Sequence, residues 1–175
     1  LPNHLHDAWP KPHDKFRSVG IHSQHHDQIL APVANSRDGY SGGMTLLRIS
    51  PAELRFDQSI WSDTDNRIRF EDRESMKQTE CAIHASLQKL NPDLRPMMAR
   101  PYTPFDVTGD SLTLPAAMLI LAHHLGLALP TDLTATGGST LHNNQLRFTQ
   151  PDFGTLASKM DAARLWGCAT MLVPC

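Results

Sequence analysis

The chain is organised around one sequence, Phe105-Asp-Val-Thr-Gly-Asp-Ser111, and the apolar run Leu112-Thr-Leu-Pro-Ala-Ala-Met-Leu-Ile-Leu-Ala122 that follows it. The run predicts a helix over Ser111–Leu129, and Pro115 is tolerated only in the first turn of that helix. A hydroxyl at a helix N-terminus lies near free N–H groups and the positive end of the dipole, which favour developing negative charge. Ser111 therefore suits two roles, a nucleophile or an ordinary helix cap.

Before this sequence, the pattern predicts strands and then a helix. Ile29–Asn35 and Met44–Ile49 are typical of strands, and residues 54–61 and 67–70 alternate apolar with polar side chains, as half-buried antiparallel strands do. Asp63-Thr-Asp-Asn66 is typical of a hairpin turn.

The pattern changes to a helical period over Ser75–Leu90. The predicted apolar face of this helix carries Met76, Thr79, Ile83, Leu87 and Leu90. Glu80, Lys77 and Lys89 lie off that face, and we interpret them as solvated. The proline-rich segment 92–104 predicts an extended segment, which could pair with a substrate strand.

Further elements follow Ser111. They are a strand over Asp132–Thr136, a hairpin over Ser139–Phe148 turning at Asn143-Asn144, a helix over Phe153–Trp166 ended by Gly167, and a strand over Cys168–Val173. This order predicts an α/β (α+β) fold in two layers, with twisted mixed sheets packed against three main helices.

The composition argues against several classes of function. With 175 residues and a net charge of −2, the chain predicts one domain with neither a nucleic-acid surface nor a polybasic membrane contact. Three widely spaced cysteines, Cys81, Cys168 and Cys175, favour free thiols in a reducing compartment, which we take to be the cytoplasm. The longest apolar run, 114–129, is too short and too polar to span a bilayer.

The N-terminal residues differ from the rest. Residues 1–28 are rich in His and Pro and lack a helix or strand period, so we interpret them as an arm that precedes a domain over 29–175. Their histidine pairs could bind metal, but no carboxylate or thiol pattern completes a site, and we favour a solvated arm with no metal.

Lys159 is the candidate partner of Ser111. Leu156, Met160, Ala163 and Trp166 form the predicted apolar face of the third helix. A lysine beside such a face usually reaches to solvent, but burial would lower its pKa and leave a neutral amine that can act as a general base. A serine nucleophile needs such a base.

Other catalytic arrangements do not fit the sequence. It has no Gly-x-Ser-x-Gly elbow and no phosphate-binding P-loop. His123 and His124 follow Ser111 on the same helix, roughly 18 Å away at 1.5 Å per residue, too far to serve it.

Several blocks together resemble the proteolytic domain of Lon proteases. They are Gly109-Asp-Ser111 with its apolar helix, Asp132-Leu-Thr-Ala-Thr-Gly137, Leu156-Ala-Ser-Lys-Met-Asp-Ala-Ala163, Gly167 and Met171-Leu-Val-Pro174. The Gly-Asp-Ser form is most similar to the archaeal branch, and birnavirus polyprotein proteases share the fold. The resemblance extends over about residues 105–174, in the order found in the family.

The resemblance implies a serine endopeptidase with a Ser-Lys dyad. It places Ser111 as nucleophile, Lys159 as general base and Thr136 as the residue that orients the lysine, although Thr136 alone would suit an ordinary strand end. The N–H groups of Asp110 and Ser111 would form the oxyanion hole. It implies a polypeptide substrate, no cofactor in this domain, ATP only if an AAA+ module lies elsewhere in the protein, and a homo-oligomer, hexameric in the family.

Some positions depart from the family pattern. Leu112 and Thr113 stand where Lon prefers small residues and could narrow access to Ser111, and Gly138 replaces a common acidic residue. Two alternatives therefore stay open. One is a catalytically inactive Lon-fold domain with an assembly or regulatory role. The other is a viral-type protease that releases itself from a polyprotein, in which case Leu1 or Cys175 would be a self-generated terminus.

Overall fold

The structure is a computed structural model and describes residues 27–34, 42–51, 70–102, 110–143 and 145–175, without the side chains of residues 70–73 and 75. The arm predicted at the N-terminus, apart from its last two residues, lies outside these ranges. So do the strand predicted over 54–61 and the hairpin predicted over 63–66.

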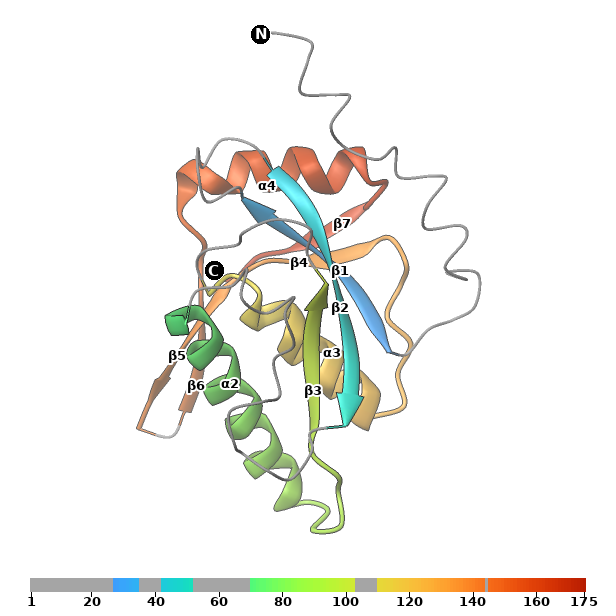
Figure 1. Cartoon of the computed structure of the whole chain (residues 1–175), viewed down its shortest axis with the longest axis vertical. Helices are drawn as coiled ribbons and strands as arrows, with labels where there is room; N and C mark the ends of the chain where they lie inside the picture. The colour runs from blue at the N-terminus through green and yellow to red at the C-terminus, as the bar shows by residue number, and fades with distance from the viewer. Residues whose placement is uncertain (1–26, 35–41, 52–69, 103–109, 144) are drawn as a thin grey trace, which may run out of the picture.

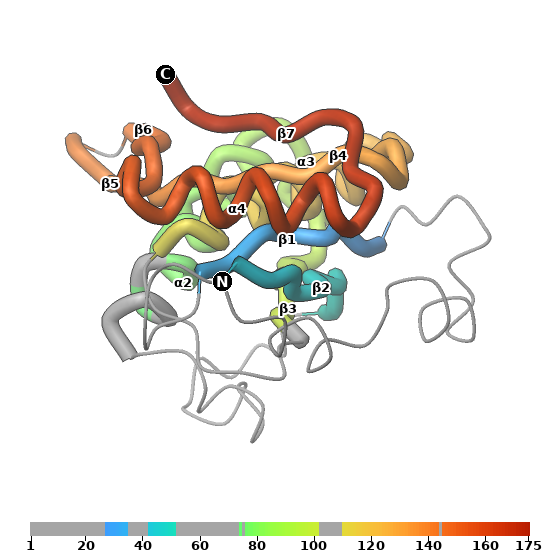
Figure 2. The backbone as a smooth tube through the Cα atoms, turned by 90° about the horizontal axis from the view of Figure 1, so that it is seen from above, coloured from blue at the N-terminus to red at the C-terminus, as the bar shows by residue number. Residues whose placement is uncertain are grey.

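The main sheet is mixed. Its strands are β1 (Gln28–Ala34), β2 (Gly42–Pro51), β3 (Met97–Tyr102), β4 (Leu133–Ala135) and β7 (Thr170–Leu172). Their order across the sheet is β3-β2-β1-β4-β7, which can be followed in Figure 2. β1, β2 and β3 pair antiparallel, whereas β4 joins β1 and β7 joins β4 in parallel. The predicted α/β class with a mixed sheet is confirmed.

A second, two-stranded sheet consists of β5 (Gly138–His142) and β6 (Gln145–Thr149). His142 pairs with Gln145, so two residues make the turn, and Asn143 has a φ of 49°. Asparagine tolerates this left-handed conformation better than most residues, which is why the hairpin turns at the position predicted from Asn143-Asn144.

Helices cover both faces of the main sheet. They are α2 (Phe70–Gln88), α3 (Thr113–His124) and α4 (Phe153–Leu165). Ile29, Ala31 and Val33 of β1 share a core with buried residues of α2 and α3, while Leu30 packs in a second core with Ala162 and Ala163 of α4. Side chains alternate across a strand, so α4 lies on the face opposite α2 and α3 (Figure 1). The prediction of two layers is therefore wrong, because both faces of β1 are apolar and both need cover.

The helix boundaries that differ most from the prediction are the start of α2 and the end of α3. α2 already includes Phe70, so the strand predicted over 67–70 is wrong at its last residue. α3 ends at His124 and not at Leu129, because Gly126 adopts a φ of 64°. The N–H groups of Gly126 and Leu127 donate to His123 and Ala122 oxygens at 3.1 and 2.8 Å, the Schellman pattern that ends helices at a glycine.

Glu80 is buried, so its interpretation as a solvated residue is wrong, although Lys89 is exposed as expected. Glu80 Oε1 accepts a hydrogen bond from the Ala99 N–H of the edge strand β3 at 2.9 Å. Burial raises the pKa of Glu80 to about 8, so its carboxyl group is largely protonated at neutral pH. The predicted apolar face of α2 is confirmed at Met76, Thr79 and Ile83, which are buried, and is wrong at Leu90, which is exposed.

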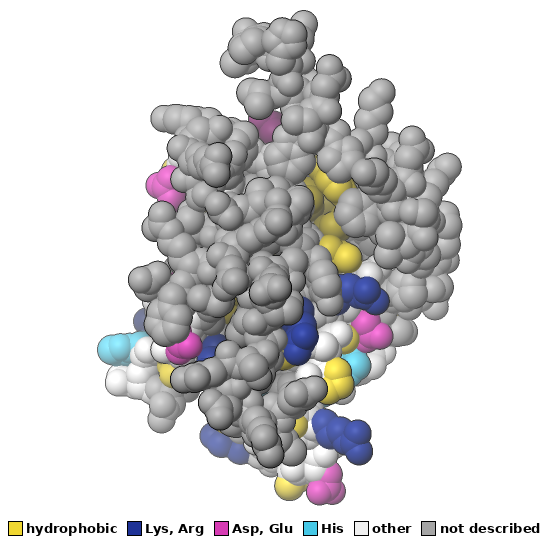
Figure 3. Space-filling view, viewed as in Figure 1, with side chains coloured by type: hydrophobic (Ala, Val, Ile, Leu, Met, Phe, Trp, Pro, Cys, Tyr) yellow, Lys and Arg dark blue, Asp and Glu magenta, His cyan; other side chains and the backbone are white. Residues whose placement is uncertain are grey.

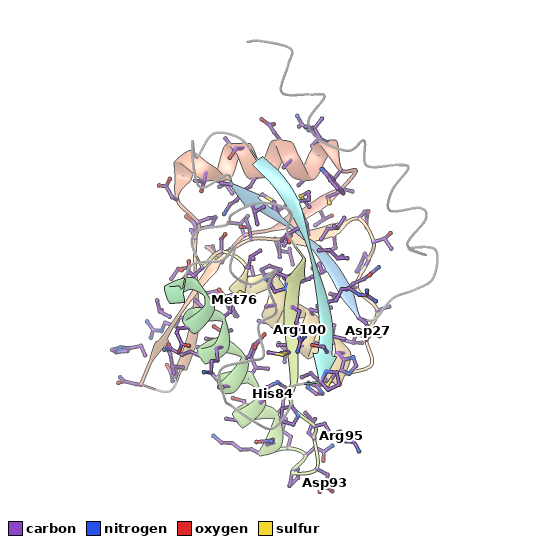
Figure 4. All side chains as sticks on the ribbon, viewed as in Figure 1. Asp27, Met76, His84, Asp93, Arg95 and Arg100 are labelled. Carbon is purple, nitrogen blue, oxygen red and sulfur yellow. The ribbon has the colours of Figure 1, made fainter. Side chains whose placement is uncertain are left out.

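α2 closes the outer edge of β3 with a second side chain. His84 lies one turn after Glu80, beside β3 (Figure 4), and its Nε2 accepts from the Met97 N–H at 3.0 Å. Pro101, two residues after Ala99, has no N–H to offer. The extended segment that we considered for substrate pairing therefore presents an edge whose donors are already used.

Among the described residues, no helix combines the length and the apolar character needed to cross a bilayer. On the face drawn in Figure 3, basic and acidic side chains are interspersed over the lower part of the described surface.

Candidate functional site

Ser111 lies in the turn that leads into α3. The helix begins at Thr113 and its cap residue is Leu112, which makes no side-chain cap hydrogen bond, so the cap position does not belong to the serine. Ser111 is 6% exposed, and its carbonyl oxygen accepts from the Gly137 N–H at 2.9 Å. The turn of Ser111 is thereby joined to the segment that follows β4.

Thr136 is the residue directly after β4, and it is fully buried. Its N–H donates to the Leu172 oxygen of β7 at 3.0 Å, which continues the pairing of β4 with β7 by one residue. The next residue, Gly137, bonds to Ser111, so Thr136 directly precedes the contact with the serine turn.

Lys159 lies at the centre of the buried face of α4, together with Ala162 and Ala163. Met160 is 53% exposed, so its predicted place on the apolar face is wrong, and the lysine takes that place instead. Small side chains allow α4 to approach the sheet closely. A Cβ on Gly42 of β2 would lie 2.0 Å from the Ser158 carbonyl oxygen, so only glycine fits there.

The amine of Lys159 meets Thr136. Lys159 Nζ donates to Thr136 Oγ1 at 3.3 Å, and the lysine is only 4% exposed. Burial lowers the pKa of Lys159 to about 8, while the negative charges of Asp110 and Asp152 act in the opposite direction. With that pKa, about a tenth of the amine is neutral at pH 7, and about half at pH 8.

The structure thus links the three residues predicted from sequence through Thr136 and its neighbour Gly137. Thr136 contacts Lys159 through its hydroxyl, and its neighbour Gly137 binds the carbonyl of Ser111. Asp110 and Ser111, whose N–H groups are the candidate oxyanion donors, lie just ahead of the N-terminus of α3, where the helix dipole is positive.

Leu112 and Thr113 use their side chains in the interior. Leu112 is 1% exposed and belongs to the core shared with α2 and the sheet. Thr113 is fully buried, and its Oγ1 donates to the Gly137 oxygen at 3.0 Å. The larger side chains at these two positions therefore pack in the protein interior beside the serine turn.

Sequence reasoning missed a role for the Asp110 side chain. Asp110 Oδ2 accepts from the Ser139 N–H at 3.1 Å. A Cβ on Gly138 would lie 2.4 Å from an oxygen of the same carboxylate, so the aspartate occupies the space that a side chain at position 138 would need. The signal in the sequence was Gly137-Gly138 downstream of Gly-Asp-Ser, because paired glycines often mark a close approach of another segment.

Three histidines gather away from this site. His123 Nδ1 lies 2.9 Å from Oδ1 of Asp27, the residue before β1, and the rings of His84 and His124 meet edge to face at 5.4 Å. In the part of the chain that the structure describes, no three or more His, Cys, Asp or Glu side chains form a group that could hold a metal ion. All three cysteines are free, as predicted.

Compared with models of known protein families and with curated proteins, the chain matches none of them. The likeness to Lon proteolytic domains therefore rests on the sequence blocks, and the case for a catalytic site rests on the geometry around Thr136.

Proposed function

We propose that this chain is a serine endopeptidase that cleaves peptide bonds with a dyad of Ser111 and Lys159, in the manner of Lon proteolytic domains. One observation carries the proposal. A lysine with a pKa lowered to about 8 is buried and held by Thr136, and the residue after Thr136 binds the turn of a serine at a helix N-terminus. A buried lysine without a catalytic role would be costly to keep.

The reaction follows from these groups. Neutral Lys159 Nζ takes the proton of Ser111 as its Oγ attacks the peptide carbonyl carbon. The N–H groups of Asp110 and Ser111 stabilise the oxyanion. When the carbon–nitrogen bond breaks, Lys159 returns the proton to the leaving amine, and Ser111 remains as an ester. Lys159 then takes a proton from water as its oxygen attacks the ester carbon, and it returns that proton to Ser111 Oγ when the ester bond breaks and the acid product leaves.

Thr136 orients the amine during these steps. Its Oγ1 accepts one hydrogen bond from Lys159, which fixes the direction of the nitrogen and leaves its lone pair for the serine proton. The site needs no cofactor in this scheme. A hexameric ring is part of the proposal by resemblance alone, and ATP would be used only if an AAA+ module lies elsewhere in the protein. A cytoplasmic location is proposed from the three free cysteines.

A fluorophosphonate probe, which forms a covalent bond to activated serines, tests the dyad. We expect Ser111 to be labelled, with a rate that rises about tenfold per pH unit up to about pH 8 and then levels, because the neutral amine is the active form. Ser111→Ala and Lys159→Met should abolish labelling. Ser86→Ala, at an exposed serine of α2, is the matched control and should label at the normal rate.

The same experiment distinguishes the protease from the inactive alternative. That alternative is favoured by one observation, the 6% exposure of Ser111, which leaves the hydroxyl little contact with solvent. A folded sample that neither labels at Ser111 nor cleaves an unfolded protein such as casein at pH 8–9 would support a silent assembly or regulatory domain and would refute the protease.

A further inference from the structure

Four hydrogen bonds tie the serine turn to the segment 137–139, and only one of them depends on a charged side chain. Gly137 N–H donates to the Ser111 oxygen, and the Gly137 oxygen accepts from both the N–H of Leu114 and the hydroxyl of Thr113. These three act through backbone groups of Gly137. The fourth joins the Asp110 carboxylate to the Ser139 N–H at 3.1 Å.

Ser139, the donor of this fourth bond, is held in place by its neighbours. Ser139 lies near the start of β5 and is 8% exposed, and its hydroxyl shares a hydrogen bond with the Thr79 hydroxyl of α2. β5 also pairs along its full length with β6. Asp110 is therefore bonded to a strand that is itself fixed on two sides.

The space for the carboxylate is provided by Gly138. Both Asp110 oxygens lie within 2.5 Å of the place where a Cβ on Gly138 would stand, far closer than real contacts. Any side chain at position 138 would push the carboxylate away from the Ser139 N–H. The position of the Asp110 carboxylate therefore depends on the absence of a side chain at Gly138.

The same carboxylate acts on the base. Its negative charge favours the protonated form of Lys159 and so opposes the effect of burial on the lysine pKa. Asp152 adds to this effect from the N-terminus of α4, where it caps the helix through the Gly154 N–H. No other described carboxylate acts on Lys159 to a comparable degree.

We infer that Asp110 is a positioning residue, which latches the turn of Ser111 to β5 through Ser139 and so holds the nucleophile in register with Lys159 and Thr136. The inference rests on the proposed function, since a nucleophile must be present for its placement to matter. The latch itself is a physical contact that can be measured without any activity.

The test compares Asp110→Asn and Asp110→Ala in the full 175-residue chain. Asn keeps a side-chain oxygen for the Ser139 N–H but removes the charge, whereas Ala removes both. The readouts are the fluorophosphonate labelling rate from pH 6 to 10, and hydrogen exchange of the Ser139 amide by NMR. Asp161→Asn is the control, because it removes one charge from an exposed residue of α4.

We expect Asp110→Ala to label about 10- to 100-fold more slowly at every pH, because a misplaced nucleophile loses about that much rate. Its Ser139 amide should exchange at least about tenfold faster. Asp110→Asn should label within a few fold of wild type at pH 9, while its pH profile moves to lower pH, because the lysine loses the charge that favours its proton. Asp161→Asn should change neither readout.

The outcomes distinguish the Asp110–Ser139 contact from its effect on the labelling of Ser111. If the hydrogen-exchange rate of the Ser139 amide is unchanged in Asp110→Ala, the proposed contact between Asp110 and Ser139 is refuted, whatever the labelling rate. Faster exchange with a normal labelling rate in Asp110→Ala overturns the positioning role. If wild type itself does not label, the proposed function fails and the positioning role fails with it, while exchange still decides whether the contact exists. Gly138→Ala, which displaces the carboxylate without removing it, should reproduce Asp110→Ala.

Discussion

Replacement of Lys159 by methionine should make the protein more stable at neutral pH while it removes the proposed activity. The folded-state pKa of Lys159 is about 8, compared with 10.5 for an unperturbed lysine. At about 1.4 kcal/mol per pH unit, this difference corresponds to about 3 kcal/mol by which burial of the charged amine destabilises the folded state. Methionine has a similar length and no charge to bury.

The net gain is smaller than that figure. The substitution also removes the hydrogen bond from Lys159 Nζ to Thr136 Oγ1, which contributes about 1 kcal/mol. We therefore expect Lys159→Met to be about 2 kcal/mol more stable at pH 7. For a chain of this size, that difference raises the melting temperature by about 4–8 °C.

The sign of the pH dependence follows from the lowered pKa. Below pH 8 the lysine is protonated in both the folded and the unfolded state, so the full destabilisation is present. Between pH 8 and 10.5 only the unfolded state holds the extra proton, so wild-type stability rises with pH relative to the variant. The two unfolding free energies should become equal near about pH 9.5, above which the wild type, with its hydrogen bond to Thr136, is the more stable.

Urea unfolding of both proteins at pH 7, 8, 9 and 10 measures the difference, because all other titrating groups are shared. Lys89→Met is the matched control, since Lys89 is exposed, and its stability should stay within about 0.5 kcal/mol of wild type. A gap between wild type and Lys159→Met that does not change with pH would refute the lowered pKa, and with it the argument that Lys159 serves as a base.

Substitutions at three more residues test the site and the structure that supports it. Thr136→Val should slow labelling of the serine at pH 9 by about tenfold or more, whereas Thr136→Ser, which keeps the acceptor for Lys159, should restore most of the rate. Glu80→Gln should become increasingly more stable than wild type between pH 4.5 and 8, by up to about 5 kcal/mol in urea unfolding, because the raised pKa contributes stability that is complete below pH 4.5 and lost by pH 8. Gly42→Ala should lower the unfolding free energy by about 3 kcal/mol, because its Cβ would meet the Ser158 carbonyl at 2.0 Å, and an unchanged melting temperature would contradict this close contact.

Most of the fold could be predicted because each element has a clear local signal. The strands 29–35 and 44–49 and the hairpin at Asn143 follow from apolar patterns and turn residues, and their partners confirm them. The early end of α3 could not be predicted with the same ease. The apolar run continues to Leu129, and only the left-handed conformation of Gly126 stops the helix.

The environment of Lys159 shows where sequence reasoning reaches its limit. Periodicity alone assigns Met160 to the apolar face, because a methionine is apolar and a lysine is not. In the structure the buried face of α4 is shifted by about one residue, so that Met160 is exposed and Lys159 is buried. The cost of burying the Lys159 amine is partly offset by the hydroxyl of Thr136, which follows β4 and is far from Lys159 in sequence. The same holds for Glu80, whose partner lies on β3.

The residues of the candidate site were chosen by resemblance, and their catalytic roles stay a prediction. Lys159 contacts Thr136, and Gly137 binds the backbone of Ser111. The pair Gly137-Gly138 indicates a close approach of another segment but not that this segment is Asp110, because a contact between two segments 28 residues apart leaves no period in the sequence.

The way in which α2 covers β3 has a consequence for how the protein fails under stress. Among the described residues no strand pairs with the outer edge of β3, and Glu80 and His84 bind its N–H groups with side chains where a sheet would use backbone. If α2 detaches, two donors become available at once on an extended segment, and a second chain can supply the missing partner. Damage to α2 should therefore appear as concentration-dependent self-association before global unfolding, so α2 protects the solubility of the protein as well as its stability.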